Sequence, residues 1–544
     1  MPLQKNQVLT LQVERLSSDG SGVAHSPEGE TVFIPGAAPG DEARVRIVKD
    51  CKRYAFGILD EVLKPSPDRI PVDCAVAGPC GGCSLRHLDY AAELRAKQEN
   101  VADAFARIGG LDVPVLPIVG SPEIDRYRNK VQFPVGTDKA GRPCIGFYAG
   151  RTHRIVPCPD CRLQPGVLNE IGNTLCAFFA EKGIHPYNEE TGKGLVRHIF
   201  LRRGAHSGQI MVCLVSTRAK IPSADELCTR LKEAFPDIVT ILLNVNAKNT
   251  NVILGSETHT LYGQGYIEDT LCGVPVQLGS LSFYQVNTLA AEQLYGIAAE
   301  YAQLTPDDLL LDLYCGMGTI GLSMADHCRE LVGVEIVPEA IESAKANAAR
   351  MGAAVSAKSR FFCADAGQAA AQLAAEGLHP DVVMLDPPRK GCDGATLSAV
   401  VRMAPRRVVY VSCNPATAAR DAAWLEQNGY HAEKVQPVDL FPRTKHVETV
   451  VLLSKGEIDS KKVRVEFSLE DMDMSGFQKG ATYEQIKAYV LEHTGLKVSS
   501  LYISQIKRKC GLDVGQNYNL SKKEDAKVPK CPPEKEAAIR DALK

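Results

Sequence analysis

A single cysteine, Cys413, stands at the end of an apolar run that is typical of a buried β-strand. The run is Arg407-Val408-Val409-Tyr410-Val411-Ser412, and Asn414-Pro415 follows the cysteine. A thiolate is a strong nucleophile, whereas a thiol packed in an apolar core is inert, and burial is the commonest fate of a cysteine. The Asn-Pro exit and the preceding Asp386-Pro387-Pro388-Arg389 segment favour a nucleophile presented beside a bound cofactor.

A glycine-rich turn in the same half of the chain predicts where that cofactor binds. Asp312-Leu313-Tyr314-Cys315-Gly316-Met317-Gly318-Thr319-Ile320-Gly321 follows a strand, and its missing side chains let the backbone approach a nucleotide-like ligand. The turn alone does not separate NAD from S-adenosylmethionine. Glu335 ends the next strand, where a carboxylate can accept hydrogen bonds from ribose hydroxyls. Because an Asp-Pro-Pro exit is typical of nucleic-acid methyltransferases, we favour S-adenosylmethionine; a merely solvated Glu335 is the alternative.

One reaction of pyrimidines needs a reactive cysteine together with a nearby base. Carbon 5 of uracil is too weak a nucleophile to take a methyl group directly, so a thiolate must first add to carbon 6. A base must then remove the proton from carbon 5 before the thiolate can leave. Cys413 and the downstream Glu448 fit these two roles.

Five motifs in this order resemble the RNA uracil-5-methyltransferase family, the TrmA/RlmD group, from the N-terminal region to about Leu453. They are Phe283-Tyr284-Gln285-Val286-Asn287, Asp312-Leu313-Tyr314-Cys315-Gly316, Asp386-Pro387-Pro388-Arg389-Lys390-Gly391, Ser412-Cys413-Asn414-Pro415 and His446-Val447-Glu448-Thr449-Val450. The resemblance implies that Cys413 is the nucleophile and Glu448 the proton acceptor. It also implies an S-adenosylmethionine site that is lined by Gln285, Tyr314, Glu335 and Asp386.

A cysteine cluster has the spacing of a metal site. Cys74, Cys80 and Cys83 lie close together in the chain, and Cys161 lies far downstream. Four sulfur ligands suit zinc or an iron-sulfur cluster equally. The resemblance implies a [4Fe-4S] cluster, as in the ribosomal RNA members of the family. Cys158 is a rival fourth ligand, and we choose Cys161 because Cys161-Arg162-Leu163-Gln164 aligns with the family's pattern.

The expected architecture is a multidomain α/β protein. Residues 1–62 contain short alternating strands and resemble the TRAM domain, an OB-like barrel that binds RNA. Residues 63–270 form a central β-rich domain that carries the cysteine cluster and a helix over 85–108. Residues 271–455 alternate strands with helices such as Pro338 to Met351, which predicts a doubly wound parallel sheet in a Rossmann-like methyltransferase domain.

The C-terminal extension, residues 456–544, lies outside the resemblance. Two helical stretches, Tyr483 to His493 and Val498 to Lys509, are separated by Gly495. Their apolar positions fit a helical pair. A helix-turn-helix reader of nucleic acid is one interpretation, and Ser499, Ser500, Gln505, Lys507 and Arg508 would suit its second helix. A solvated helical hairpin is the other.

Bulk properties exclude several classes of protein. With 544 residues, 45% hydrophobic and 23% charged, the chain has the composition of a soluble globular protein, and no apolar run or N-terminal signal indicates a membrane or a secretory route. We expect a cytoplasmic monomer whose 18 cysteines are not a disulfide framework. Because the net charge is -3, RNA contacts must come from local patches: Arg126 to Lys130, Arg151 to Arg154, Arg197-His198 and Arg202-Arg203.

Together these observations predict an RNA uracil-5-methyltransferase that acts on a flipped-out uridine of 23S ribosomal RNA. A tRNA uracil-5-methyltransferase is the first alternative, and the cysteine cluster argues against it only by analogy. An exocyclic-amine methyltransferase would normally have an aromatic residue after Asp-Pro-Pro, where this chain has Arg389. A non-catalytic RNA-binding or redox-sensing protein on the same scaffold would not need Cys413 and Glu448.

Overall fold

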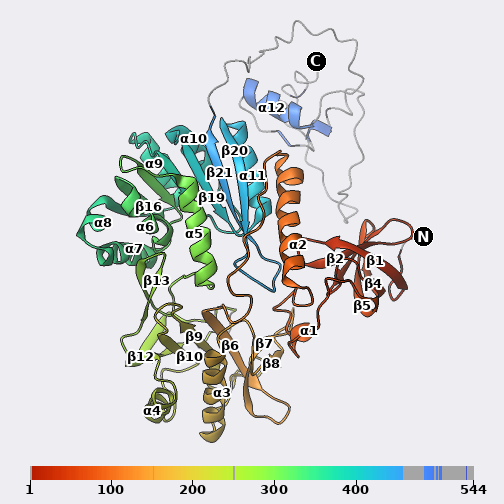
Figure 1. Ribbon diagram of the computed structural model, residues 1–544, viewed down its shortest axis with the longest axis vertical. Coiled ribbons are helices and arrows are strands. Elements are labelled where there is room, and N and C mark those ends of the chain that lie inside the picture. The colour runs from red at the N-terminus through yellow and green to blue at the C-terminus, as the bar shows by residue number, and fades with distance from the viewer. Residues whose placement is uncertain are drawn as a thin grey trace. The chain divides into compact units, whose positions relative to one another are not determined.

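The computed structural model in Figure 1 describes residues 3–150, 152–248, 251–456, 483–494, 498–499, 502–504, 506, 535 and 539. The chain divides into two compact units, Met1–Asp459 and Ser460–Lys544. The first unit contains three sheets larger than a hairpin, and the second contains the helix of the C-terminal extension. Among the described residues, no helix is both long enough and apolar enough to cross a membrane.

The first five strands close into a small barrel in the order β1-β2-β3-β5-β4. In β1, Leu11, Val13 and Leu16 are buried while most of their neighbours are exposed, so one face of the strand lines the barrel core. Antiparallel pairing of β1 with β4 closes the barrel. The predicted OB-like barrel is confirmed. Its strands are β1 (Val8–Leu16), β2 (Ser21–His25), β3 (Thr31–Pro35), β4 (Glu42–Asp50) and β5 (Tyr54–Lys64).

A helix follows the cysteine-rich segment, which itself contains the short α1 (Ala77–Cys80). Helix α2 (Tyr90–Asp103) begins after Asp89, whose side chain accepts a hydrogen bond from the Ala92 N–H, and this cap explains why the helix starts later than the predicted residue 85. A π-helical turn, η1 (Ala104–Gly109), completes it, and Gly110 ends it with a φ of 63°. Val101 and Phe105 pack in the same core as the C-terminal sheet.

Helix α2 is joined to the C-terminal part of this unit by a buried ionic network. Lys97 Nζ donates to Glu93 Oε1 at 2.8 Å, to Asp439 Oδ1 at 2.7 Å and to the Phe441 carbonyl at 3.1 Å. Tyr90 donates its hydroxyl to the second oxygen of Asp439 at 3.0 Å. Burial raises the pKa of Glu93 to about 7, against the pull of Lys97. The segment that follows Asp439 leads directly to the residues before β21.

A Lys97→Met variant is expected to lose about 3–5 kcal/mol of unfolding free energy, because two buried carboxylates lose their cation. The urea midpoint of this unit measures the loss. Lys139→Met removes the same charge from an exposed hairpin position and should change the free energy of unfolding by less than about 0.5 kcal/mol. A Lys97→Met protein as stable as the Lys139→Met protein would show that the network contributes little.

The central region forms a seven-stranded sheet in the order β12-β11-β10-β9-β6-β7-β8. It also contains two helices, α3 and α4, that the strand-and-turn prediction missed, although Leu168, Ile171 and Leu175 have helical spacing. The helices are α3 (Gly166–Glu181) and α4 (Ala224–Ala234). The strands are β6 (Lys130–Thr137), β7 (Pro143–Tyr148), β8 (Ile155–Pro157), β9 (Val196–Arg203), β10 (Ile210–Ser216), β11 (Ile238–Val245) and β12 (Glu257–Gly263).

The C-terminal sheet of this unit has the order β17-β16-β15-β18-β19-β21-β20. The first five of these strands are parallel, as predicted, and their two faces contribute to two different cores, which explains their nearly continuous apolar runs. Its strands are β15 (Leu309–Leu313), β16 (Glu330–Glu335), β17 (Ser359–Cys363), β18 (Val382–Leu385), β19 (Arg407–Ser412), β20 (Tyr430–Val438) and β21 (Glu448–Lys455).

One edge of the predicted parallel sheet is antiparallel. Strand β21 is inserted between β19 and β20 and is antiparallel to both (Figure 1). A strand that follows its neighbour without a crossover helix returns in the opposite direction. As a result, Glu448, the first residue of β21, lies beside Ser412, the last residue of β19.

Helices connect and cover these strands, and a hairpin precedes them. The hairpin is β13 (Ile267–Leu271) with β14 (Val274–Leu278). The helices are α5 (Thr288–Ala302), α6 (Thr319–Ser323), the 3-10 turn η2 (Ala325–His327), α7 (Pro338–Met351), α8 (Ala353–Lys358), α9 (Ala366–Ala375), α10 (Gly394–Met403) and α11 (Pro415–Gln427). Helix α7 has the predicted bounds.

In the second unit the structure describes helix α12 (Tyr483–Thr494) and a few further helical residues, among them 502–504. Its Ile486 and Val490 are buried with Val498 and Ile506, as the predicted apolar spacing requires. In the second predicted helix, Val498 to Lys509, residues 502–504 and 506 are helical, and half of its residues lie outside the described ones. These include Ser500, Gln505, Lys507 and Arg508, so the helix-turn-helix interpretation stays a prediction.

Candidate active site

The glycine turn after β15 leaves open space at the end of the sheet. Gly321 donates its N–H to Asp312 Oδ2 at 3.0 Å, and Gly318 adopts a φ of 79° that other residues rarely reach. A Cβ atom at Gly316 would meet no atom within 4 Å. The backbone is therefore exposed to a ligand, as the sequence predicts.

Glu335, the last residue of β16, lies beside this turn. Its Oε2 accepts the Gly316 N–H at 3.2 Å, and its Oε1 accepts the N–H groups of Ile336 and Val337 at 2.9 and 3.0 Å. These bonds fix the carboxylate and leave lone pairs free on both oxygens. Ile336 is 61% exposed, so an apolar surface adjoins the carboxylate. This arrangement suits the ribose and the base of a nucleoside.

Two further carboxyl groups lie close enough for their charges to interact. Asp312 Oδ1 is buried and has no hydrogen-bond partner among the described residues, and burial raises the pKa of Asp312 to about 8. Burial also raises the pKa of Asp386, which follows β18, to about 7. An orphaned buried carboxylate suits a cationic ligand group. Our sequence prediction omitted Asp312, although its place at a strand end before the glycine turn was a signal.

The other two predicted cofactor residues, Tyr314 and Gln285, lie on two separate segments. Tyr314 has a φ of 66°, and its hydroxyl lies 3.2 Å from Thr396 Oγ1. A non-glycine residue with such a φ often marks a functional turn. Gln285 is partly exposed, and its backbone carbonyl accepts a hydrogen bond from Asn129 Nδ2 at 2.7 Å.

The antiparallel pairing of β19 with β21 brings the two predicted catalytic residues together. Ser412 is the register partner of Thr449, and Thr449 donates its hydroxyl to the Ser412 carbonyl at 3.1 Å. Cys413 and Glu448 are the next residues beyond this pair. Glu448 is 5% exposed, whereas Cys413 is only partly buried. A ligand can therefore reach the thiol while the carboxyl group lies below the surface.

Arg389 connects these two groups, and the sequence prediction treated it only as a missing aromatic residue. Burial and the nearby Glu448 raise the pKa of the Cys413 thiol, while a hydrogen bond to Arg389 lowers it. Burial and Asp386 hold the pKa of Glu448 well above its ordinary value, against the effect of Arg389. Arg389 Nη2 also lies 3.4 Å from His446 Nδ1. Burial and Arg389 lower the pKa of His446 to about 4, so its ring is neutral.

All the predicted cluster cysteines line one cavity, with a volume of about 270 Å³. The thiols are those of Cys74, Cys80, Cys83, Cys158 and Cys161, so both candidates for the fourth ligand are present. A hydrogen bond from Cys158 lowers the pKa of Cys161 to about 7. Within the part of the chain that the structure describes, no three His, Cys, Asp or Glu side chains are placed so that they could hold a metal ion.

Comparison with known proteins decides the family. Residues 252–456 match the family model described as tRNA (Uracil-5-)-methyltransferase, and residues 2–59 match the TRAM domain. An uncharacterized RNA methyltransferase of Halalkalibacterium halodurans is 43% identical over 453 residues, which cover 83% of this chain and 98% of the relative. The chain belongs to the RNA uracil-5-methyltransferase family.

Two further proteins support this assignment. An uncharacterized RNA methyltransferase of Clostridium tetani is 40% identical and covers 84% of this chain and 98% of its own length. The crystal structure of Pyrococcus abyssi tRNA (uracil-54, C5)-methyltransferase in complex with S-adenosyl-L-homocysteine has a TM-score of 0.65 at 27% identity, covering 82% of this chain and 100% of that one. The chain is therefore an S-adenosylmethionine-dependent RNA methyltransferase with a TRAM barrel and a methyltransferase fold.

The methyltransferase does not carry all its predicted basic patches on its surface. Arg197, His198 and Arg202 are 4%, 5% and 1% exposed, so most of the patch expected there is buried, and only Arg203 of its four residues is partly exposed. Arg126 is paired with Asp160 at 2.7 Å. Arg128 and Lys130 remain partly exposed and line the cysteine cavity, while Arg151 lies outside the described residues.

Binding of S-adenosylmethionine to the methyltransferase is expected to strengthen as the pH rises from 6 to 8. With pKa values raised to about 8 and 7, Asp312 and Asp386 keep protons in the folded enzyme that they have lost in the unfolded chain. Their contribution to stability is therefore lost as the pH rises through this window. A cationic ligand favours the ionised carboxylates, so its affinity grows by up to about tenfold per pH unit for each proton released.

The shift in melting temperature caused by S-adenosylmethionine at pH 6, 7 and 8 measures this dependence. Asp312→Asn should flatten it, and Asp326→Asn, on η2, is a matched control that should not. A shift that is equally steep in the Asp312→Asn enzyme would assign the released proton to another group.

Proposed function

We propose that the enzyme methylates carbon 5 of a uridine in 23S ribosomal RNA through a covalent bond between Cys413 and carbon 6. The observation that carries the proposal is the position of the Cys413 thiol at the end of β19. Arg389 is hydrogen-bonded to this thiol, and Glu448 lies beside it on the paired strand β21. A nucleophile, a cation and a buried carboxyl group in one place suit addition followed by elimination.

In the first step the Cys413 thiolate bonds to carbon 6, and the electrons of the double bond move toward carbon 5 and the carbonyl at carbon 4. Arg389 stabilises the thiolate before the attack by its hydrogen bond and its charge. S-adenosylmethionine supplies the methyl group to carbon 5 when it is bound. Glu448 then accepts the proton of carbon 5, the double bond re-forms, and the thiolate leaves.

The geometry at the ends of β15, β16 and β18 supports the proposed cofactor residues. Glu335 would accept hydrogen bonds from the ribose hydroxyls of S-adenosylmethionine. Asp312 and Asp386 would face the positively charged methionine part of the same molecule. Gln285 and Tyr314 would complete the site, in agreement with the motifs. Phe283, which is 73% exposed beside Gln285, offers a ring on which an unstacked base can lie.

We also propose a [4Fe-4S] cluster held by Cys74, Cys80, Cys83 and Cys161. The position of these thiols around one cavity supports it, since a four-iron cluster takes four thiolates. Because no three of the described thiols are placed to hold a metal ion in this structure, cluster binding would have to bring them closer together. Protein purified without oxygen should be brown and contain about four irons per chain. Cys161→Ala and Cys158→Ala distinguish the fourth ligand, because only loss of the true ligand should lower the iron content. Zinc in place of iron would refute the cluster.

The choice of 23S ribosomal RNA rests on this cysteine cluster, and tRNA is the second candidate because the Pyrococcus abyssi enzyme is a tRNA (uracil-54, C5)-methyltransferase. Residues 1–62, 63–270, 271–455 and 456–544 remain our proposed domains, with the TRAM barrel as an RNA contact. Incubation with labelled S-adenosylmethionine and unmodified 23S ribosomal RNA or tRNA, followed by mapping of the label, tests the substrate. Label in tRNA alone would overturn the choice.

A further inference from the structure

Helix α11 begins directly after Cys413 and contacts the segment that carries Arg389. Asn414, the helix cap, donates its side-chain N–H to the Arg389 carbonyl at 2.9 Å. Thr417 donates its hydroxyl to the same carbonyl at 3.4 Å. Residues three and four apart share one face of a helix, so the same face also presents the residues at 420 and 421 to this segment.

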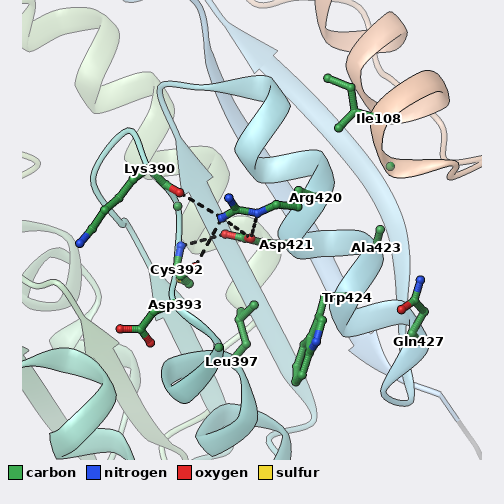
Figure 2. Close-up of a pocket in the computed structure, with 13 residues that line it drawn as sticks. Ile108, Lys390, Cys392, Asp393, Leu397, Arg420, Asp421, Ala423, Trp424 and Gln427 are labelled. Carbon is green, nitrogen blue, oxygen red and sulfur yellow. Dashed lines mark hydrogen bonds and ion pairs between the residues drawn. The ribbon is translucent and has the colours of Figure 1, made fainter. Parts of the chain in front are cut away.

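Arg420 holds the next part of the segment through its backbone. Its Nη2 donates to the Lys390 carbonyl at 3.0 Å and lies 3.4 Å from the Cys392 carbonyl (Figure 2). Its Nε donates to Asp421 Oδ1 at 2.8 Å. The guanidinium therefore bridges the helix and the segment with bonds from two of its nitrogens.

Asp421 fixes the far end of the segment to the sheet. It is 1% exposed, and its Oδ2 accepts the Cys392 N–H at 2.8 Å and the Tyr410 hydroxyl at 2.6 Å. Tyr410 is a fully buried residue of β19, the strand that ends at Ser412. One carboxylate thus connects the segment after β18 to the strand that presents Cys413.

The backbone of the segment fits closely against this pair. Gly391 has a φ of 79°, and a Cβ atom there would lie 2.5 Å from both Arg420 Nη2 and Asp421 Oδ2. Beyond the segment lies a cavity of about 520 Å³, which Leu397 and Trp424 also line (Figure 2). Within residues 390–394, Cys392 packs in the hydrophobic core, and the polar bonds from α11 hold the backbone around it.

We propose that Arg420 and Asp421 are positioning residues that hold Arg389 against the Cys413 thiol. The proposal rests on the proposed function, in which Cys413 is the nucleophile. Helix α11 would then both present the thiol at its start and fix the cation that activates it. Arg420 and Asp421 together form a clamp on the segment that carries Arg389. Without this clamp, Arg389 would move away from the thiol, and the thiolate fraction of Cys413 would fall at neutral pH.

The test compares the full-length Arg420→Met enzyme with the parent. Alkylation of Cys413 by iodoacetamide is followed from pH 6 to 10 by mass spectrometry of the peptide that contains this cysteine. The pH midpoint of Cys413 alkylation should rise by about one pH unit, since the thiolate loses its hydrogen bond to the charged Arg389. Formation of the covalent adduct with 5-fluorouridine RNA should slow about tenfold at pH 7.5, while the melting-temperature shift caused by S-adenosylmethionine stays at the parental value.

Three further variants separate positioning from general damage. Arg420→Lys keeps the charge and one bond, and it should restore part of the midpoint shift. Arg402→Met removes an exposed arginine from α10 and should leave the midpoint unchanged. Arg389→Met should raise the midpoint, and Arg420→Met should add nothing further in that background.

An equal midpoint in the parent and the Arg420→Met enzyme would overturn the clamp while leaving the nucleophile assignment intact. So would an additional shift in the Arg389→Met background, because Arg420 would then act independently of Arg389. Failure of the proposed function gives a different result: the 5-fluorouridine adduct would form in the absence of the Cys413 thiol.

Discussion

A Cys413→Ala enzyme is expected to bind S-adenosylmethionine and RNA but to lose methyl transfer by at least about four orders of magnitude. Carbon 5 of the pyrimidine becomes electron-rich only after a nucleophile has added to carbon 6, so no other residue replaces the lost thiolate. Arg389 remains in place, and the proposed cofactor site at the ends of β15, β16 and β18 is unchanged. Affinity for the cofactor should therefore stay within about twofold of the parent.

Two measurements check this result. Methyl transfer is followed with labelled S-adenosylmethionine, and the covalent bond is followed as a protein–RNA complex with 5-fluorouridine RNA on a denaturing gel. The complex should be absent for Cys413→Ala and present for Cys228→Ala, which removes a partly buried thiol from α4 of the central region. An adduct that survives the alanine replacement, or a Cys413→Ser enzyme as fast as the parent, would assign the nucleophile elsewhere.

The sequence predicted those features that depend on local pattern. Alternating burial in β1 indicated the barrel, and apolar runs separated by helical stretches indicated the parallel strands. Cys413 and Glu335 could be found because each ends such a run. Glu448 came from the reaction's need for a base and from the resemblance, since the strand that carries it is antiparallel and no local periodicity shows where a strand is inserted.

Features that depend on tertiary environment could not be predicted from the sequence. Arg389 lies next to the thiol only because the segment after β18 turns toward α11. The importance of Asp312 appears once its second oxygen is known to be buried without a hydrogen-bond partner among the described residues. The arginines of β9 looked like a basic patch, but both faces of that strand are covered, and a list of charges cannot show this.

Replacement of Glu448 by glutamine is expected to block the last step of the reaction and to leave the first steps possible. The amide has nearly the shape of the carboxylate but cannot accept the proton from carbon 5. Turnover should fall about 10²- to 10⁴-fold. Methylated RNA should therefore stay bonded to Cys413, and a denaturing gel should show label from S-adenosylmethionine in a protein–RNA complex with ordinary uridine RNA.

The pH dependence of the parent enzyme should agree with this role. Burial and Asp386 hold the pKa of Glu448 well above its ordinary value, so the ionised base becomes more abundant, and elimination faster, as the pH rises. In Glu448→Gln the decay of the complex should lose this dependence. Glu433→Gln, at an exposed position of the neighbouring strand β20, should release its product at the parental rate. If Glu448→Gln formed no complex at all, the carboxylate would act before methyl transfer, as the base that ionises Cys413.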